Sequence, residues 1–338
     1  MKILVDIGHP AHVHYFRNLI GILEKEGVQF KVLARDKDVT HALLDAYGIK
    51  FTSKGKGGEG ILDRIEYTVS SLIQLKRLIE EFKPDLCISH ASPYLAFVAS
   101  VMGVRHIMFN ENERATFFRF IVRYFNSEVY TPESFIDGKN ICYSKLPSYL
   151  RLAYLHKNHF SPDPNILEVT GDDYVLFRFV SRKALHDRAG MNLSEEFKVK
   201  LVTELRKFTN VWISSEGDLP DQLKPYKLTL PPHKMHDAIA YSSMLIGDSG
   251  SMSAEAAMLG VPSIFIYHYD LGYIKELQDK YGLIYHFESE LCENLILQKC
   301  KVILSNPDRE TVYHSRRDNM LSEKEDMTRL MLDIVNYN

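Results

Sequence analysis

The stretch Met244-Leu245-Ile246-Gly247-Asp248-Ser249-Gly250-Ser251 passes from an apolar run into a turn of small residues. Residues 252–259 then have the composition of a helix, which Gly260 and Pro262 end before a second apolar run at 264–266. An order of strand, tight turn, helix and strand is typical of parallel α/β sheets. This stretch therefore predicts an α/β fold in the second half of the chain.

The turn itself suggests a binding site for a diphosphate. Small residues let the backbone approach a bulky anion, and the first amides of a helix supply donors and the positive end of its dipole. We therefore take Ser249, Gly250 and Ser251 as nucleotide-binding candidates. Glu255 lies one turn into the helix, where its carboxylate can accept hydrogen bonds from a ribose. In the simpler alternative, Asp248 or Ser249 only caps the helix and Glu255 faces solvent.

The same alternation of strands and helices extends through both halves of the chain. In the first half, the apolar runs predict strands at 2–6, 30–34, 49–52, 86–89, 106–109 and 128–130, and the longest helix is expected at 61–82. In the second half, strands are expected at 174–178, 211–214, 227–229, 244–247, 262–266 and 283–285. The region after 289 is expected to be helical, with a break at Pro307.

This pattern predicts two doubly wound, parallel-sheet (Rossmann-like) domains facing across a cleft. The proline-marked segment 161–165 is the expected linker. The domains are therefore expected at 1–165 and 166–338, with the last helix packing back on the N-terminal domain.

Composition limits the class of protein. The chain has 338 residues, 45% hydrophobic and 25% charged, which is typical of a globular protein with two ordinary domains. A formal charge of −3 argues against a dedicated nucleic-acid binder. The four cysteines form no C-x-x-C pair, and no run resembles a signal peptide or a membrane span, so we expect a cytoplasmic protein.

Three histidines crowd the loop and helix start that follow the first predicted strand. His9 and His12 are the catalytic candidates there, because an imidazole can act as a base for a hydroxyl or as a donor to developing phosphate charge. A helix-cap or packing role is the alternative, and it fits His14 best. No carboxylate or cysteine neighbours the triplet at ligand spacing, so we expect no metal.

Two further charged residues follow predicted strands. Glu111 comes after the strand at 106–109, where its side chain can project into a cleft, although a solvated charged turn would look the same. Arg178 ends the first strand of the second domain. It can face an anion there or form a buried salt bridge.

Several motifs together resemble those of the GT-B superfamily. They are the glycine turn with Ala-Glu-Ala-Ala-Met-Leu-Gly-Val-Pro at 254–262, Asp-Ile-Gly-His-Pro-Ala-His-Val-His-Tyr-Phe-Arg at 6–17, Lys-Pro-Asp at 83–85, and Arg-Phe-Val-Ser with a later His-Asp at 178–187. The superfamily includes nucleotide-sugar glycosyltransferases and non-hydrolysing UDP-N-acetylglucosamine 2-epimerases, and the chain resembles an uncharacterised prokaryotic family within it. The resemblance implies that Ser249, Gly250 and Ser251 hold a diphosphate, that Glu255 binds the ribose, and that Arg178 faces the diphosphate. It also puts His233 in a loop that borders the nucleotide base.

The resemblance bears on the reaction as well. Glu111 matches a post-strand glutamate that serves acid–base chemistry in the 2-epimerases. Those enzymes also carry an aspartate in a His-Gly-Asp run, whereas this chain reads His90-Ala91-Ser92. Because epimerisation by elimination and readdition needs more than one placed acid–base group, the missing aspartate disfavours it.

The sequence thus predicts a glycosyltransferase that uses a nucleoside-diphosphate sugar, with UDP as the expected nucleotide, in cell-surface polysaccharide or glycoconjugate synthesis. A UDP-sugar 2-epimerase and a catalytically silent nucleotide-sugar-binding protein are the alternatives. We expect no cofactor, no nucleic-acid partner, and a glycan or lipid-linked acceptor. The arginine- and aromatic-rich segment 114–125 can contact a membrane surface, although such a stripe is more often a core helix.

Overall fold

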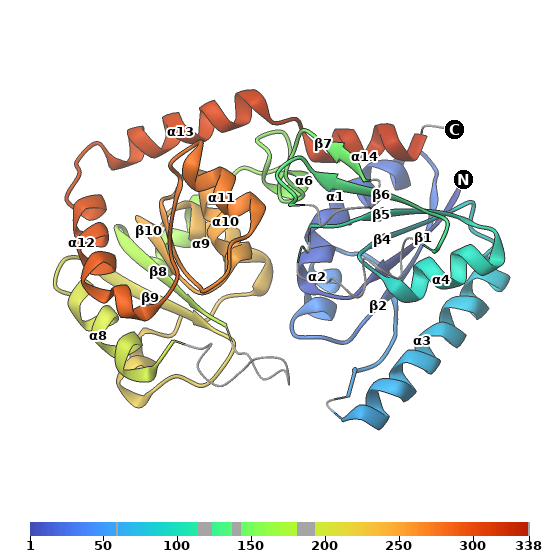
Figure 1. Ribbon diagram of the computed structural model, residues 1–338, viewed down its shortest axis with the longest axis horizontal. Helices are drawn as coiled ribbons and strands as arrows, with labels where there is room; N and C mark the ends of the chain where they lie inside the picture. Colours follow the sequence, from blue (N-terminus) through green and yellow to red (C-terminus); the bar gives the residue numbers. More distant parts are fainter. Residues whose placement is uncertain (59, 112, 114–123, 137–142, 181–192, 337–338) are drawn as a thin grey trace. The chain divides into compact units, whose positions relative to one another are not determined.

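The computed structural model describes residues 1–338 except 59, 112, 114–123, 137–142, 181–192 and 337–338 (Figure 1). The chain divides into two compact units. Unit 1 comprises Met1–His159 and Glu325–Asn338, and unit 2 comprises Phe160–Lys324.

Unit 1 contains a seven-stranded parallel sheet with the order β3-β2-β1-β4-β5-β6-β7. Its strands are β1 (Lys2–Ile7), β2 (Gln29–Ala34), β3 (Phe51–Ser53), β4 (Leu86–His90), β5 (Arg105–Phe109), β6 (Ser127–Pro132) and β7 (Ser144–Leu146). The inner strands are apolar on both faces because helices cover both. The direction of the strand order reverses between β1 and β4, and ligands of open α/β sheets bind beyond the carboxyl ends of strands at such a reversal.

Helices lie on both faces of this sheet (Figure 1). They are α1 (Pro10–Lys25), α2 (Thr40–Ala46), α3 (Ile61–Phe82), α4 (Pro93–Met102), α6 (Leu152–Leu155) and α14 (Met327–Asn336). Helices α3 and α4 pack together, whereas α1 contacts α2, α6 and the C-terminal α14. Gly103 ends α4 with φ 68°, a left-handed conformation that glycine adopts without strain.

Unit 2 contains a five-stranded parallel sheet with the order β12-β11-β10-β8-β9. Its strands are β8 (Tyr174–Phe179), β9 (Asn210–Ser215), β10 (Met244–Gly247), β11 (Ser263–Ile266) and β12 (Ile284–Phe287). Its α-helices are α7 (Leu167–Thr170), α8 (Glu195–Leu205), α9 (Met235–Ala240), α10 (Gly250–Leu259), α11 (Gly272–Asp279), α12 (Glu293–Leu304) and α13 (Arg309–Glu323). Short 3₁₀ turns are η1 (Pro164–Ile166), η2 (Asp221–Tyr226), η3 (Pro232–Lys234) and η4 (Glu290–Cys292). The strand order reverses here between β8 and β10.

The fold class predicted from the sequence is confirmed: both sheets are parallel and doubly wound. The structure differs from the sequence prediction at one predicted strand and at one strand that was not predicted. Residues 227–229 form no full strand, because Lys227 makes only an isolated bridge to Ile213. Strand β7 was not predicted, because its three residues include only one buried apolar side chain, Leu146.

None of the helices in the described part of the chain is long and apolar enough to cross a membrane. The proposed membrane-contact segment 114–125 lies almost wholly outside the described residues.

Candidate functional site

In unit 2, the predicted glycine turn lies at the carboxyl end of β10. Strand β10 ends at Gly247 and α10 begins at Gly250, two residues earlier than its apolar run suggests. Ser249 is the N-cap, and its Oγ accepts a hydrogen bond from the Met252 amide at 3.3 Å. The backbone amides of the first turn of α10, a ten-residue helix, therefore lie at the point where the strand order of this sheet reverses.

The glycines of this turn are required by packing within the protein. A Cβ added to Gly247 would lie 1.9 Å from the carbonyl oxygen of Arg178 on the adjacent strand β8. A Cβ on Gly250 would lie 3.0 Å from the side chains of Leu271 and Tyr273. The small residues at 247 and 250 therefore have a structural reason that is independent of any ligand.

Glu255 is buried in α10, with 6% of its surface exposed. Its Oε1 lies 3.5 Å from Nε2 of His236, which is also buried and comes from α9. His233, the residue chosen from the sequence, lies one helical turn earlier in η3 and is half-buried. Sequence reasoning thus missed His236, although its spacing from His233 was a usable signal.

Arg178 lies near the end of β8 and its guanidinium is largely engaged. Nη1 donates to Ser214 Oγ at 2.8 Å, and Nη2 forms an ion pair with Glu216. Its Nε is buried and has no hydrogen-bond partner among the residues that the structure describes. Beside it, Asp248 Oδ1 accepts a hydrogen bond from the Val180 amide at 2.9 Å, which ties the β8 and β10 strand ends together.

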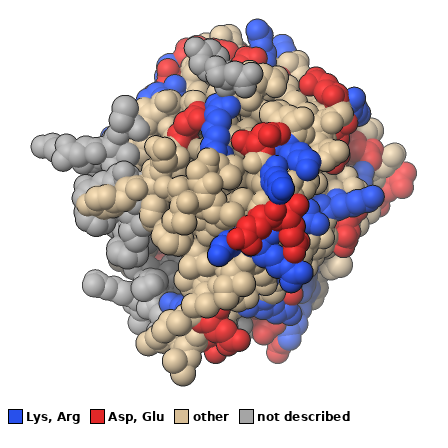
Figure 2. Space-filling view, turned by 90° about the vertical axis from the view of Figure 1, so that its right-hand side faces the viewer, with Lys and Arg blue, Asp and Glu red and all other residues tan. Residues whose placement is uncertain are grey.

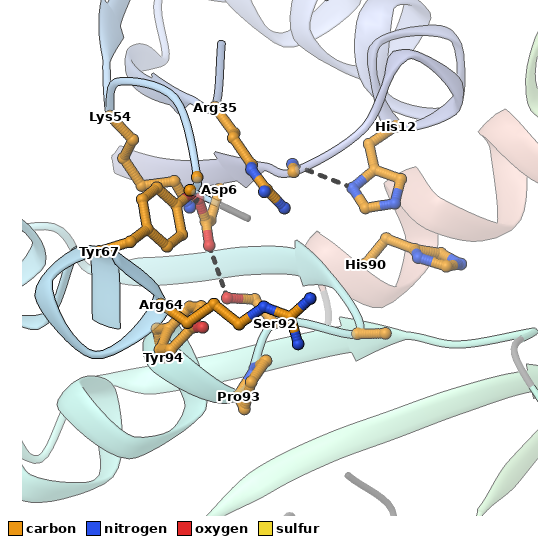
Figure 3. Close-up of a pocket in the computed structure, with 14 residues that line it drawn as sticks. Asp6, His12, Arg35, Lys54, Arg64, Tyr67, His90, Ser92, Pro93 and Tyr94 are labelled. Carbon is orange, nitrogen blue, oxygen red and sulfur yellow. Dashed lines mark hydrogen bonds and ion pairs between the residues drawn. The ribbon is translucent and has the colours of Figure 1, made fainter. Parts of the chain in front are cut away.

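Unit 1 has a pocket of about 470 Å³ at the carboxyl ends of β1 to β4 (Figure 3). The pocket lies where the strand order reverses, which is the place expected for a ligand in this fold. It is lined by Asp6, Gly8, His12, Arg35, Lys54, Gly57, Gly58, Arg64, Tyr67, His90, Ala91, Ser92, Pro93 and Tyr94.

The two histidines chosen from the sequence both accept backbone hydrogen bonds. His12 Nδ1 accepts from the Gly8 amide at 3.2 Å, and His9 Nδ1 accepts from the Ala11 amide at 3.2 Å. A neutral imidazole that accepts at Nδ1 carries its proton on Nε2. Each ring therefore presents an Nε2–H donor, but only His12 lines the pocket, while His9 is exposed and caps α1.

His90, at the end of β4, packs against His12 with a ring-centroid distance of 4.4 Å. Burial lowers the pKa of His90 to about 4. The charge of Glu111 raises this pKa, and the charge of Arg151 lowers it further. Burial and the neighbouring His90 also lower the pKa of His12 well below its usual range. Both rings are therefore neutral at pH 7, and within the described part of the chain the buried Nε2 of His90 has no hydrogen-bond partner.

Glu111 does not line this pocket. Its Oε1 accepts from the Tyr15 hydroxyl at 2.5 Å, and its Oε2 accepts from Arg151 Nη1 at 2.9 Å. Arg151 is only 1% exposed, so this is a buried ion pair that joins the end of β5 to the segment before α6. The Tyr15 ring lies between this pair and the pocket histidines, with its centroid 5.3 Å from that of His90.

A carboxylate that sequence reasoning missed does lie in the pocket. Asp6 is 2% exposed, forms an ion pair with Lys54, and accepts a hydrogen bond from Ser92 Oγ at 2.5 Å. The residue before Ser92, Ala91, has a φ of 48°, which is rare for a residue other than glycine. The available signal was an acidic residue in an otherwise apolar first strand.

Among the described residues, no three His, Cys, Asp or Glu side chains converge in a way that could hold a metal ion.

Comparisons with known proteins agree with this architecture. The chain is similar to a UDP-GlcNAc 2-epimerase from Neisseria meningitidis bound to UDP-GlcNAc, with a TM-score of 0.73, 14% identity and full coverage of both chains. It is also similar to the spinosyn rhamnosyltransferase SpnG in complex with spinosyn aglycone, with a TM-score of 0.64, 12% identity, and coverage of 99% of this chain and 100% of that one. The chain therefore has the GT-B fold that the sequence motifs predicted.

Its relatives by sequence are uncharacterised. Residues 1–146 match the model of a family described as "Protein of unknown function (DUF354)". An uncharacterised protein of Methanocaldococcus jannaschii is 24% identical over 358 residues, which span 100% of this chain and 98% of the relative. Both matches are to sequences of unknown function, as the resemblance to an uncharacterised prokaryotic family implies.

Proposed function

We propose that this protein is a glycosyltransferase that takes its sugar from a UDP-sugar and serves cell-surface polysaccharide or glycoconjugate synthesis. Unit 2 binds the donor and the pocket of unit 1 binds the acceptor. The observation that carries the proposal is the 470 Å³ pocket at the reversal of the first sheet, lined by Asp6, His12 and His90. A transferase needs such a second substrate site in addition to a nucleotide site, whereas an epimerase acts on the nucleotide sugar alone.

The donor site consists of the turn before α10. The amides of Gly250 and Ser251 and the helix dipole stabilise the diphosphate, both when the donor binds and when UDP leaves. Glu255, oriented by His236, accepts hydrogen bonds from the ribose. The partly exposed Arg178 side chain supplies a positive charge toward the diphosphate, and His233 borders the base. The UDP-GlcNAc bound to the similar epimerase supports UDP as the nucleotide.

In the acceptor pocket, the geometry supports different tasks for the residues involved. His12 presents Nε2–H, so it donates a hydrogen bond to the acceptor or to the departing phosphate. Asp6, with Ser92 hydrogen-bonded to it, is the group that can take a proton. His9 at the α1 cap and Glu111 in its ion pair act as positioning residues, since Glu111 fixes Tyr15 against the histidines.

The transfer step then balances as follows. The acceptor hydroxyl oxygen bonds to the anomeric carbon of the sugar, and the bond from that carbon to the diphosphate oxygen breaks. The bonding electron pair leaves with UDP. The acceptor proton passes to Ser92 Oγ as the Ser92 proton passes to Asp6 Oδ2, across the existing 2.5 Å hydrogen bond.

A 2-epimerase remains the second candidate function, and one observation favours it. Asp6 places a carboxylate beside Ser92, at the strand end where the sequence showed no acidic residue. Incubation with UDP-GlcNAc in D₂O without an acceptor separates the two functions. Deuterium at C2 of the sugar would support the epimerase, because that reaction removes and returns the C2 proton, whereas a transferase leaves it in place.

The donor proposal is tested by a thermal-shift titration with UDP, GDP, CMP and dTDP. We expect UDP to raise the melting temperature, since a ligand at one hundred times its Kd adds about 2.7 kcal/mol to the free energy of unfolding. Glu255→Gln, which keeps the side-chain shape, should abolish most of the shift. Glu310→Gln, at an exposed position at the start of α13, is the matched control and should retain it. Absence of a shift with all four nucleotides would overturn the proposal.

A further inference from the structure

Two arginines enter the pocket of unit 1, and the residues that the structure describes give neither of them an acidic partner. Arg35 follows β2 and Arg64 lies in the first turn of α3, and their guanidinium groups extend into the pocket from opposite sides in Figure 3. Among the described residues, neither has an ion-pair partner. The Nε of Arg35 is buried without a hydrogen-bond partner, and its guanidinium lies over the ring of Tyr67 at 5.0 Å from the centroid. The Tyr67 ring thus supports the Arg35 guanidinium on one face.

The loop before α3 is shaped around Arg35. A Cβ added to Gly57 would lie 2.0 Å from Arg35 Nη2. Only a glycine therefore lets the guanidinium lie this close to the backbone. A side chain at position 57 would displace the end of the Arg35 side chain, which gives a structural reason for one glycine of the glycine-rich segment 53–60.

Charge in the pocket is not balanced. Lys54 and Asp6 form an ion pair, and His12 and His90 are neutral, so the lining residues that the structure describes carry a net charge of about +2 from the two guanidinium groups. Asp36 and Asp63, which neighbour the two arginines in the sequence, have other contacts within the described part of the chain. Asp36 lies 3.8 Å from Lys56 Nζ, and Asp63 accepts from the Gly60 amide at 3.2 Å.

This excess of positive charge contrasts with the outer surface. On the face shown in Figure 2, basic and acidic side chains lie next to one another and neither sign forms an extended patch. The pocket also receives the N-terminal end of the ten-residue helix α4, through Ser92 and Pro93, which adds a positive dipole end.

We infer that the pocket binds the acidic group of the acceptor, a carboxylate or a phosphate, through Arg35 and Arg64. This inference rests on the proposed function, because it names the class of acceptor for the same site. Guanidinium groups match both anions with paired, charge-assisted hydrogen bonds. The volume of about 470 Å³ is within the range of small-molecule sites and admits an acidic sugar unit.

The test is calorimetric titration of the full chain with glucose 6-phosphate, glucuronate and glucose. We expect both acids to bind more tightly than glucose by at least about tenfold, which corresponds to the loss of one charge-assisted hydrogen bond. A preference for glucose 6-phosphate would identify a phosphate acceptor, and a preference for glucuronate would identify a carboxylate. Equal binding of all three compounds would overturn the inference.

Variants connect the binding to the two arginines. Arg35→Gln and Arg64→Gln should each weaken binding of the preferred acid by roughly tenfold or more. Arg77→Gln is the matched control, since it lies on the same helix α3 in an exposed pair with Glu81 and should change binding less than about twofold. Unchanged affinity in both pocket variants would show that the acid binds elsewhere and would overturn the inference.

A parallel titration with UDP separates this inference from the proposed function. Arg35→Gln and Arg64→Gln should bind UDP as the wild type does, because the donor residues lie in unit 2. If UDP binds and neither acid does, the inference is wrong and the donor site stands. If the acids bind and UDP does not, the proposed function is wrong and the anion pocket stands.

Discussion

Both units contain a reversal of strand order in a parallel sheet, but different kinds of groups lie at the two reversals. At the β1–β4 reversal of unit 1, charged side chains line a pocket, and two of them have no acidic partner among the described residues. At the β8–β10 reversal of unit 2, the charged side chains are paired. Arg178 contacts Glu216, and Glu255 contacts His236. What unit 2 offers is mainly the backbone at the start of α10.

This difference suggests a division of roles. Backbone amides at a helix start suit a group that every nucleotide sugar shares, namely the diphosphate. Side chains in a pocket suit the part of a reaction that differs between enzymes, namely the acceptor and its proton. In the proposed division of roles, the fold fixes the donor site, and the particular residues at the ends of β1 to β4 determine the acceptor site.

The largest expected contrast concerns the two arginine–glutamate pairs. Arg151→Met should lower the free energy of unfolding by about 3–5 kcal/mol, because it leaves the Glu111 carboxylate buried without its cation. Arg178→Met should cost less than about 1 kcal/mol, because its partner Glu216 is 39% exposed. Urea unfolding followed by far-UV circular dichroism measures both values.

The double variant Arg151→Met with Glu111→Gln is the control for this comparison. It removes the buried charge and keeps an acceptor for the Tyr15 hydroxyl, so it should recover most of the lost stability. Equal costs for Arg151→Met and Arg178→Met would mean that the two sites do not differ in the way described here.

The next effect concerns acid sensitivity, which we expect to originate largely in unit 1. Burial lowers the pKa of His106 to about 4, against the opposing influence of Asp6 and Glu128. The unfolded chain takes up this proton near pH 6.5 but the folded chain only near pH 4, so protonation favours unfolding. The free energy of unfolding should therefore fall by roughly 3 kcal/mol from this residue between those pH values and be unaffected by it above pH 6.5.

Urea unfolding at a series of pH values checks this prediction. His106→Gln should show a shallower fall in stability between pH 6.5 and 4 than the wild type, whatever its stability at pH 7. His106 contacts Ser89 and Ser127 through its two ring nitrogens, so the substitution also removes hydrogen bonds and changes the stability at pH 7. The slope of stability against pH is therefore the quantity to compare. The same pH slope in both proteins would contradict the predicted linkage.

The smallest effect compares two serine N-caps. Ser92 and Ser249 each accept a hydrogen bond from the third amide of their helix, at 3.3 Å in both cases. Ser249→Ala should cost about 1 kcal/mol, the usual value for a lost cap. Ser92→Ala should cost about 1–3 kcal/mol more, because it also removes the hydroxyl that donates to the buried Asp6.

Thermal or urea unfolding of the two alanine variants measures this difference directly. Ser92→Thr keeps the hydroxyl and should restore most of the stability. If Ser92→Ala and Ser249→Ala cost the same, the Asp6 contact contributes nothing beyond the cap.

The sequence by itself determined the elements and the fold class. Apolar runs, glycine and proline stops and the turn at 247–251 are local signals, and they recovered α3 at both ends and the strand at each reversal. The same signals placed His12 in a loop just before the first helix, but in the structure it lies in the first turn of α1, from where it lines the pocket. They missed β7, because three residues with one buried side chain carry almost no periodic signal.

Only the tertiary structure decided which charges meet. Asp6 contacts Lys54 and Ser92, which are 48 and 86 residues away, and Glu111 contacts Arg151, 40 residues away. These contacts depend on which strand ends adjoin in the order β3-β2-β1-β4-β5, and no local pattern encodes that order. The sequence therefore specified the turn before α10 from neighbouring residues. The pocket, whose two arginines have no acidic partner in the described part of the chain, instead arises from strand ends that are distant in the chain and adjacent in the sheet.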